Sequence, residues 1–522
     1  MLRLRTPRFD ARFRVLADPG GGKSPPGERF NRLWPFSGTI EASSGEPYSM
    51  ISNKGGEVMS CMINTISELP SHPDSINLEP DLSRAHEVFE RLAEGYGKMF
   101  VVQFAGNPMV VVADAKALNF ILCKRPELFA PYRNNSRILE AIRSDGIETA
   151  DDQEWRQQRE LIARSMESKY LAQYFEIIKE VTEAFSQRWL DCAERLSESG
   201  FEAEIFGFSA SVFTTIMFGD LTDLPPGERE DANSLLLNLA AVLGERIDEL
   251  LPQMQLEKFS ENKDFEEEIS HIVRVIEKLI GHTEKSLARN DGVDTPQNLL
   301  QVLVETSNAM GLNAGQLKLT ENILQILLAS EPTTADTLIR VLHYLAGNPE
   351  VQTAIRNEVD AVLQKRGMIE NLKDLKKLKC VDAAIAETMR IASVSRLVLV
   401  QAKTDLILED VEIARGTPLV LLTAYCGLEN ENFHQAAVFD HQRWHGASRA
   451  DTEPHNVKAA LGFGAGPRSC PGRGLAMLVM KAAVAMICGN FQICQNREKT
   501  APDALNSEER PLSPGLRLNV LD

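Results

Sequence analysis

One cysteine-containing loop holds the residues whose types and spacing point most directly to chemistry. It reads LGFGAGPRSCPGRGL from Leu461 to Leu475, so glycines surround the single thiol of Cys470. Pro471 follows at once, and proline suits the first turn of a helix because it has no N–H to leave unpaired. The apolar spacing beyond it predicts a helix, whose N-terminal dipole would stabilise a thiolate and lower the pKa of Cys470. Such a thiolate is suited to act as a nucleophile, a zinc ligand or the axial ligand of a haem iron.

The spacing within this loop resembles a known family signature. Phe463, Gly466, Arg468, Cys470 and Gly472 follow the pattern F-x-x-G-x-R-x-C-x-G, which is similar to the haem-binding signature of the cytochrome P450 family. The resemblance implies that Cys470 ligates the iron of haem b, that Arg468 binds a haem propionate, and that Phe463 and Gly466 border the cofactor. It also implies the cytochrome P450 fold, which is mainly α with a small β region. The plain alternative is that Cys470 is only a small buried apolar residue.

A carboxylate and two arginines form a second constellation. Glu387 and Arg390 are three residues apart, which places them on one face of a predicted helix. By itself such a pair is usually a solvent-exposed contact of small energy. Arg443 lies in the segment FDHQRW, which resembles the family segment that supplies a second arginine to this pair. The resemblance therefore implies a buried ionic network that stabilises the haem side of the fold.

Two further residues share one face of a predicted helix. Trp155 and Arg159 are four residues apart, and the plain interpretation is a half-buried aromatic beside a surface cation. The resemblance implies instead that both reach the haem propionates, to which a planar guanidinium can donate two parallel hydrogen bonds. Arg396 is a further arginine considered for that role.

The segment ASEPTT, residues 329–334, resembles the part of the family's long central helix that borders the cofactor. The family has a glycine and an acid where this chain has Ser330 and Pro332, while Thr333 is kept. Pro332 predicts an interruption, either a distorted helix or a new helix capped by Ser330. The resemblance implies that Thr333 helps to deliver protons when dioxygen is cleaved. Glu331 is the local acid that could replace the missing one, although successive helix residues do not share a face.

Composition limits the possible classes of protein. The chain has 522 residues with a formal net charge of -18, and this excess of negative charge argues against nucleic-acid binding. Its eight cysteines are scattered without a C-x-x-C pair, which argues against an iron–sulfur site, a structural zinc site and a disulfide-stapled scaffold. No apolar run approaches the roughly 18 residues that a membrane span needs. We therefore expect no transmembrane anchor and a soluble, cytoplasmic protein.

The chain divides into two predicted parts. Residues 1–75 are rich in Gly, Pro, Ser and Arg and are predicted to form a flexible extension, whose early arginines also fit a mitochondrial transit peptide. Mitochondrial or peripheral-membrane locations are thus alternatives. Residues 76–522 are predicted to be one haem domain. Helical periodicity is found over 155–195, 230–254, 263–290 and 316–347, and β-type runs over 99–104, 109–112, 397–408 and 418–424.

The resemblance predicts a haem-thiolate monooxygenase that inserts one oxygen atom from O2 into a lipophilic small molecule. No segment resembles a flavin, nicotinamide or iron–sulfur module, so electrons would come from a separate reductase or ferredoxin. Arg473 and Lys481, just beyond the thiolate, are candidates for docking an acidic partner. One alternative is a peroxygenase, isomerase or dehydratase that needs no reductase, which the missing acid at Pro332 favours. The other is a non-catalytic haem-binding protein.

Overall fold

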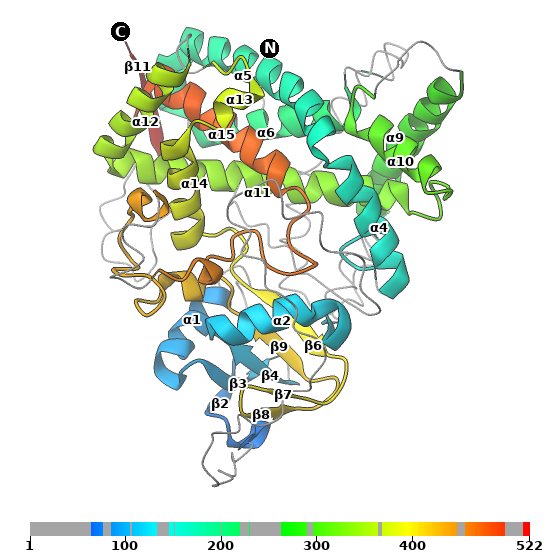
Figure 1. The fold of residues 1–522 in the computed structure, drawn as a ribbon, viewed down its shortest axis with the longest axis vertical. Coiled ribbons are helices and arrows are strands. Elements are labelled where there is room, and N and C mark those ends of the chain that lie inside the picture. Colours follow the sequence, from blue (N-terminus) through cyan, green and yellow to red (C-terminus); the bar gives the residue numbers. More distant parts are fainter. Residues whose placement is uncertain are drawn as a thin grey trace, which may run out of the picture.

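The computed structural model describes residues 64–76, 85–104, 107–132, 146–150, 152–199, 201–219, 229, 263–289, 296–363, 368–445, 455–495 and 515–521. The helix predicted over 230–254 and residues 1–63 of the predicted extension lie outside these ranges. The described chain is mainly helical, as the sequence predicts, and its principal sheet lies at one end of the molecule (Figure 1).

Long helices make up the larger part of the fold, with α11 running across it (Figure 1). The α-helices of the described ranges are α1 (Ala85–Tyr96), α2 (Ala115–Leu128), α4 (Asp152–Ser165), α5 (Ser168–Ser199), α6 (Phe201–Phe218), α9 (Lys263–Arg289), α10 (Leu299–Ala309), α11 (Leu319–Gly347), α12 (Pro349–Val362), the short α13 (Leu372–Leu375), α14 (Lys379–Ile391) and α15 (Arg473–Asn490). Leucines at helical spacing bury one face of α11, where Leu324, Leu338 and Leu342 are fully buried. The apolar stripe predicted after Cys470 is likewise the buried face of α15.

The principal sheet joins strands from both ends of the chain, in the order β2-β3-β4-β9-β6-β5. Its strands are β2 (Ser71–Ile76), β3 (Met99–Phe104), β4 (Asn107–Val112), β5 (Phe129–Pro131), β6 (Val398–Ala402) and β9 (Pro418–Leu421). β4 and β9 run parallel, with Val110 opposite Leu419 and Val112 opposite Leu421. The smaller sheets contain β1 (Asn64–Thr65), β8 (Val411–Ile413) and β7 (Leu406–Leu408), and β10 (Phe491–Gln495) with β11 (Leu516–Val520).

Residues 64–76 are part of the folded domain. β1 pairs with β8 through Asn64 and Val411, and β2 pairs with β3 through Ser75 and Gln103. An extension that reached residue 75 would include β1 and all but the last residue of β2, and both strands pair with strands of the fold. The strands escaped prediction because they are short and polar, without the alternation of apolar residues that indicates a half-buried strand. The folded part of the described chain therefore includes residues from Asn64 onward.

Pro332 does not interrupt α11, which is continuous from Leu319 to Gly347. A proline inside a helix removes one backbone hydrogen bond and costs roughly 3 kcal/mol. Here α11 is packed on α6, and the Ser209 hydroxyl of α6 donates to the Glu331 carbonyl at 2.7 Å. Burial of the apolar face offsets the cost of the proline, because tertiary packing supplies most helix stability in a folded protein. The predicted break at this position is therefore wrong.

Two helices in the described part of the chain, α6 and α15, are long and apolar enough to cross a membrane. Of the residues in these two segments, 61% and 78% are buried within the protein. Their apolar composition is therefore explained by their place in the core, where α15 packs against α5 and α12.

Candidate active site

The loop that carries Cys470 folds back on itself before α15 begins. The Cys470 N–H donates to the Phe463 carbonyl at 2.9 Å, and the Gly464 N–H donates to the Leu461 carbonyl at 2.7 Å. Gly464 has a φ of 67°, in the left-handed region that glycine adopts without a Cβ clash. These bonds fix the position of the thiol relative to the Phe463 ring, which packs against the core.

Gly466 lets the cysteine loop lie directly on α2. Its φ is 71°, and a Cβ built on it would lie 2.4 Å from the Leu122 carbonyl oxygen and 2.7 Å from the Cys123 Cα. Both neighbours are backbone atoms that cannot rotate away. This position therefore needs glycine for two independent reasons, its backbone angle and its packing.

The thiol of Cys470 is accessible and yet enclosed. By surface area the residue is exposed, but enough protein surrounds it that burial is the largest influence on its pKa and raises it. Both observations fit a thiol that lines an internal space with protein atoms around it. We therefore treat Cys470 as part of an internal site rather than of the outer surface.

The pKa of Cys470 is raised overall, contrary to the prediction from the helix terminus. α15 begins at Arg473 with Gly472 as N-cap, so the thiol precedes the N-cap by two residues. A hydrogen bond from the Gly472 backbone and the charges of Arg159 and Arg473 lower the pKa, but burial raises it by more. A coordinating metal cation deprotonates a thiol outright, so ligation does not depend on the helix terminus.

Three of the predicted cofactor-binding residues surround this thiol. Arg159 of α4 lies near enough to Cys470 for a thiolate to raise its pKa, although burial lowers it by more. The Arg468 guanidinium carbon lies 4.4 Å from the centre of the Trp155 ring. Trp155 is buried. The fold therefore gathers Cys470, Arg159, Arg468 and Trp155, which come from α4 and the cysteine loop, into one region.

Sequence reasoning missed two charged residues of this region. Arg125, near the end of α2, is 3% exposed. The Glu148 carboxyl lies near both Arg125 and Arg468, and burial raises its pKa to about 7 although the two arginines lower it. Neither residue stands out locally, because each lies in a stretch with several other charges. Only the packing of α2 and of the 146–150 turn around the cysteine loop brings them here.

The sequence suggested Arg396 as another partner of a haem propionate, but its guanidinium forms an ion pair with Glu90 instead. Its Nη2 donates to both carboxylate oxygens of Glu90 at 3.0 Å, and the pair ties the segment before β6 to α1. Both side chains are largely buried. This bidentate ion pair makes a structural role the simpler interpretation of Arg396.

Thr333 and Glu331 lie on opposite faces of α11, because residues two apart on a helix are separated by about 200°. The Thr333 hydroxyl donates to the Ala329 carbonyl at 2.6 Å on a face where Ala329, Ser330 and Thr333 are all partly exposed. Glu331 is 6% exposed and lies on the apolar face that packs against α6. The continuous helix therefore gives Glu331 no approach to the face that carries Thr333.

Burial of Glu331 makes the stability of the protein depend on pH. Burial raises the pKa of its carboxyl from 4.5 to about 8. The folded protein thus binds this proton more tightly than the unfolded chain, and stability is lost as the pH rises from about 4.5 towards 8. We expect Glu331→Gln to abolish this loss. When the pH rises from near 6 to near 8, the free energy of unfolding should therefore fall by about 2 kcal/mol more in the wild type than in the variant.

Urea unfolding of the full-length protein at the two pH values measures this difference. Glu321→Gln is the matched control, since Glu321 lies in the first turn of the same helix and is partly exposed. Equal pH dependence in Glu331→Gln and the wild type would show that the carboxyl reaches water.

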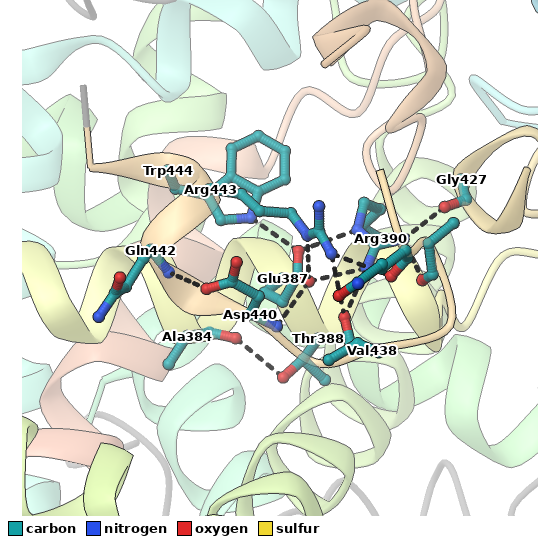
Figure 2. Close-up of polar contacts among 12 residues, drawn as sticks. Ala384, Glu387, Thr388, Arg390, Gly427, Val438, Asp440, Gln442, Arg443 and Trp444 are labelled. Atoms are coloured by element: carbon teal, nitrogen blue, oxygen red, sulfur yellow. Dashed lines mark hydrogen bonds and ion pairs between the residues drawn. The ribbon is translucent and has the colours of Figure 1, made fainter. Parts of the chain in front are cut away.

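Glu387 lies at the centre of a buried network (Figure 2). Arg390 donates to both of its oxygens, at 2.9 Å and 2.7 Å, and Arg443 donates to Oε1 at 3.0 Å. The Glu387 and Arg390 side chains are fully buried. The geometry thus brings together the three residues that the sequence suggested as a network and makes the Arg390 contact bidentate.

The network also contains partners that the sequence did not predict. The Trp444 indole donates to Glu387 Oε2 and the Asp440 backbone N–H to Oε1, both at 2.9 Å. Arg390 donates in addition to the carbonyls of Gly427 at 2.5 Å and Ala436 at 2.7 Å. A buried indole N–H needs a hydrogen-bond acceptor. Trp444, which follows Arg443 in the sequence, could therefore have been predicted to join the network.

Comparison with known proteins agrees with this arrangement. The family model Cytochrome P450 matches residues 77–516. Cytochrome P450 27C1 of Danio rerio is 25% identical over 488 residues, covering 88% of this chain and 87% of the relative. Cytochrome P450 3A9 of Rattus norvegicus is 23% identical over 440 residues, covering 80% and 84% respectively. Because the match includes the cysteine loop, the Glu387 network and α11, the chain belongs to the cytochrome P450 family of haem-thiolate monooxygenases.

Proposed function

We propose that this cytochrome P450 inserts one oxygen atom from O2 into a lipophilic small molecule, with electrons from a separate redox partner. The observation that carries the proposal is the thiol of Cys470, which is accessible by surface area, surrounded by enough protein to raise its pKa, and near the charges of Arg159 and Arg473. A thiolate ligand donates electron density to haem iron and so favours cleavage of the O–O bond. When bound, the haem supplies this redox chemistry, and the protein supplies ligation, proton delivery and exclusion of water.

The residues around Cys470 fit haem b, which carries two carboxylates on a flat ring. Arg159 and Arg468 would hold the carboxylates, and Trp155 and Phe463 would contribute apolar contacts. Among the residues that the structure describes, the Arg159 guanidinium makes no hydrogen bond or ion pair, so its donors suit an anionic ligand. Gly466 keeps the loop backbone pressed on α2, so that the thiol projects from a fixed support.

Thr333 is the residue we propose for proton delivery. Its hydroxyl lies on the partly exposed face of α11 and donates to the Ala329 carbonyl, which leaves its oxygen able to accept a hydrogen bond. Pro332 adds to this, because it cannot donate to the Leu328 carbonyl in the preceding turn. A water bonded to that carbonyl would continue the path for the proton. Glu331 is buried on the opposite face and is assigned no part in the reaction.

Thr333→Ala is expected to uncouple electron consumption from oxidation of the substrate. A positioned proton donor contributes roughly 10²- to 10⁴-fold in rate, so product per electron pair should fall by at least about tenfold while release of hydrogen peroxide rises. The measurement uses a surrogate ferredoxin system and a ligand found by screening for haem spectral shifts. Thr333→Ser should remain coupled, and Glu331→Gln should resemble the wild type. Strong uncoupling in the glutamate variant alone would reverse the assignment.

The electron donor is proposed to dock near the cysteine loop. Arg473, at the start of α15, is exposed by surface area although burial lowers the pKa of its guanidinium, and it is the candidate for contact with an acidic partner. Lys481, the other candidate, is 1% exposed and pairs with Asp382 at 2.8 Å, so it cannot contact a partner. The helical periodicity of α15 places Lys481 beside buried positions. The sequence could therefore have predicted that Lys481, unlike Arg473, is buried.

Turnover with and without reductant separates the monooxygenase from its alternatives. Oxidation of a spectral-shift ligand that needs O2 and a ferredoxin system would support the proposal. Turnover with hydrogen peroxide alone would favour a peroxygenase, and conversion without any oxidant an isomerase or dehydratase. Haem binding without turnover of any ligand would favour a non-catalytic haem-binding protein. Pro332 replaces the acid that the family usually has at this position. This replacement favours the alternative that needs no reductase, and it is the reason for testing that alternative.

A soluble, cytoplasmic location is part of the proposal. The net charge of -18 and the burial of both long apolar helices in the described ranges support it. Mitochondrial and peripheral-membrane locations are the alternatives, since the early arginines suit a transit peptide. Fractionation of cells that express the full chain with a C-terminal tag distinguishes the three.

A further inference from the structure

A short turn, Gly146–Ala150, is held against α11 by two amide side chains. The Asn322 Oδ1 accepts a hydrogen bond from the Ile147 N–H at 2.8 Å, and the Gln325 Oε1 accepts one from the Glu148 N–H at 2.9 Å. Asn322 and Gln325 are 0% and 3% exposed and are three residues apart on one face of the helix. Two successive N–H groups of the turn are thus bound by one pair of amides.

The orientation of these amides follows from their other contacts. The Asn322 Nδ2 donates to the Leu317 carbonyl at 2.8 Å, which turns its oxygen towards the 146–150 turn. A Cβ built on Gly146 would lie 2.8 Å from the Gln325 Oε1 and 3.0 Å from the Asn322 Oδ1. The turn therefore lies directly on the two amides, and glycine is the residue that permits this approach.

The opposite side of the same turn is held by the cysteine loop. Arg468 donates to the Ala150 carbonyl at 2.9 Å and to the Ile147 carbonyl at 3.4 Å. Its guanidinium also lies over Trp155, which follows the turn at the start of α4. The turn is consequently bound through its N–H groups to α11 and through its carbonyls to the arginine that precedes Cys470.

We propose that Asn322 and Gln325 are positioning residues for carboxylate recognition at the cofactor site, acting through the 146–150 turn on Arg468. An arginine side chain carries roughly 2 kcal/mol of rotamer entropy, so a guanidinium held in place before binding loses less freedom when a carboxylate arrives. Two of its five N–H donors hold the turn, and its positive charge attracts a carboxylate. The inference rests on the proposed function, because it takes haem as the ligand.

In the part of the chain that the structure describes, the 146–150 turn links these two amides to Arg468. The amides lie on α11, whereas the charged groups near Cys470 come from α4, the 146–150 turn and the cysteine loop. Burying an amide is unfavourable unless its hydrogen bonds are made, so both turn contacts must be satisfied together. A fully satisfied buried polar network selects a single arrangement. Here that arrangement fixes the carbonyls to which Arg468 binds.

Haem and haem dimethyl ester together test this role, because the ester lacks the carboxylate charges. The full-length chain is loaded with either compound, and the rate of release into excess apomyoglobin is measured for the wild type, Gln325→Met and Gln325→Glu. We expect Gln325→Met to release haem about tenfold faster, at the lower end of the effect of removing an outer-shell partner. Release of the ester should be unchanged. Gln325→Glu keeps an acceptor oxygen and should restore slow release of haem.

Each outcome decides between a positioning and a merely structural role. Equal acceleration for haem and ester would overturn the proposal, since general loosening affects both ligands, and so would no acceleration for either. Should Gln325→Met not fold, Asn322→Leu tests the neighbouring contact with the same two ligands. Failure of the proposed function is seen separately, as a wild type that binds no haem or gives no thiolate-type spectrum with carbon monoxide.

Discussion

Cys470→Ala is expected to abolish the red-shifted Soret band that the reduced wild type gives with carbon monoxide. That band requires a thiolate ligand on the haem iron, and alanine has no donor atom. The cysteine loop should keep its backbone course, because the hydrogen bond from residue 470 to the Phe463 carbonyl uses only the N–H. Absorbance spectra of the reduced, carbon monoxide-bound proteins measure the effect, which should be a complete loss of the band.

Cys123 supplies the matched control. Its backbone lies against Gly466 of the same loop, and the residue is a second, exposed cysteine. Cys123→Ala should keep the red-shifted band. A band that survives in Cys470→Ala and disappears in Cys123→Ala would transfer the ligand assignment to α2.

Glu387→Ala is expected to yield little haem-loaded protein. The substitution leaves the fully buried Arg390 without its carboxylate partner and also removes the acceptor for Arg443, Trp444 and the Asp440 N–H. Removing one partner of a buried ion pair costs about 3–5 kcal/mol, which is a large part of the 5–15 kcal/mol typical of a folded domain. The yield of thiolate-type haem per milligram of purified chain measures the loss.

An exposed ion pair on α4 serves as the control, because it shows how much a surface contact contributes to stability and haem content. Glu160 and Arg164 are four residues apart and both are about half exposed. Glu160→Ala should change stability by no more than about 0.5 kcal/mol and leave haem content unaltered. Normal haem content in Glu387→Ala as well would mean that the network does not determine assembly.

The parts of the site that the sequence could predict are those carried by short motifs. The three-residue spacing of Glu387 and Arg390 by itself places both on one helix face, and the signature around Cys470 spans only ten residues. Glu90 could not be found as the partner of Arg396, because that pair forms only when α1 packs against the segment before β6. Contacts between distant segments depend on the whole fold, which local spacing does not encode.

Pro332 illustrates a local rule outweighed by packing. Proline disfavours a helix interior, yet α11 continues through it because its buried face packs against α6. The same continuity places Glu331 opposite Thr333, which the sequence alone left open. The thiol of Cys470 is a similar case, because desolvation depends on surrounding atoms that cannot be counted before the fold is known.

The strand order of the principal sheet has a consequence for the order of events during synthesis. β4, residues 107–112, pairs in parallel with β9, residues 418–421, so this edge of β4 has no partner until most of the chain has been made. At 5–20 residues per second the ribosome needs roughly 15 to 60 s to make the intervening segment. During that interval β3 and β4 present an apolar, unpaired edge that is open to association with other nascent chains. Slow translation should therefore increase the need of this protein for chaperones more than it would for a sheet built from consecutive strands.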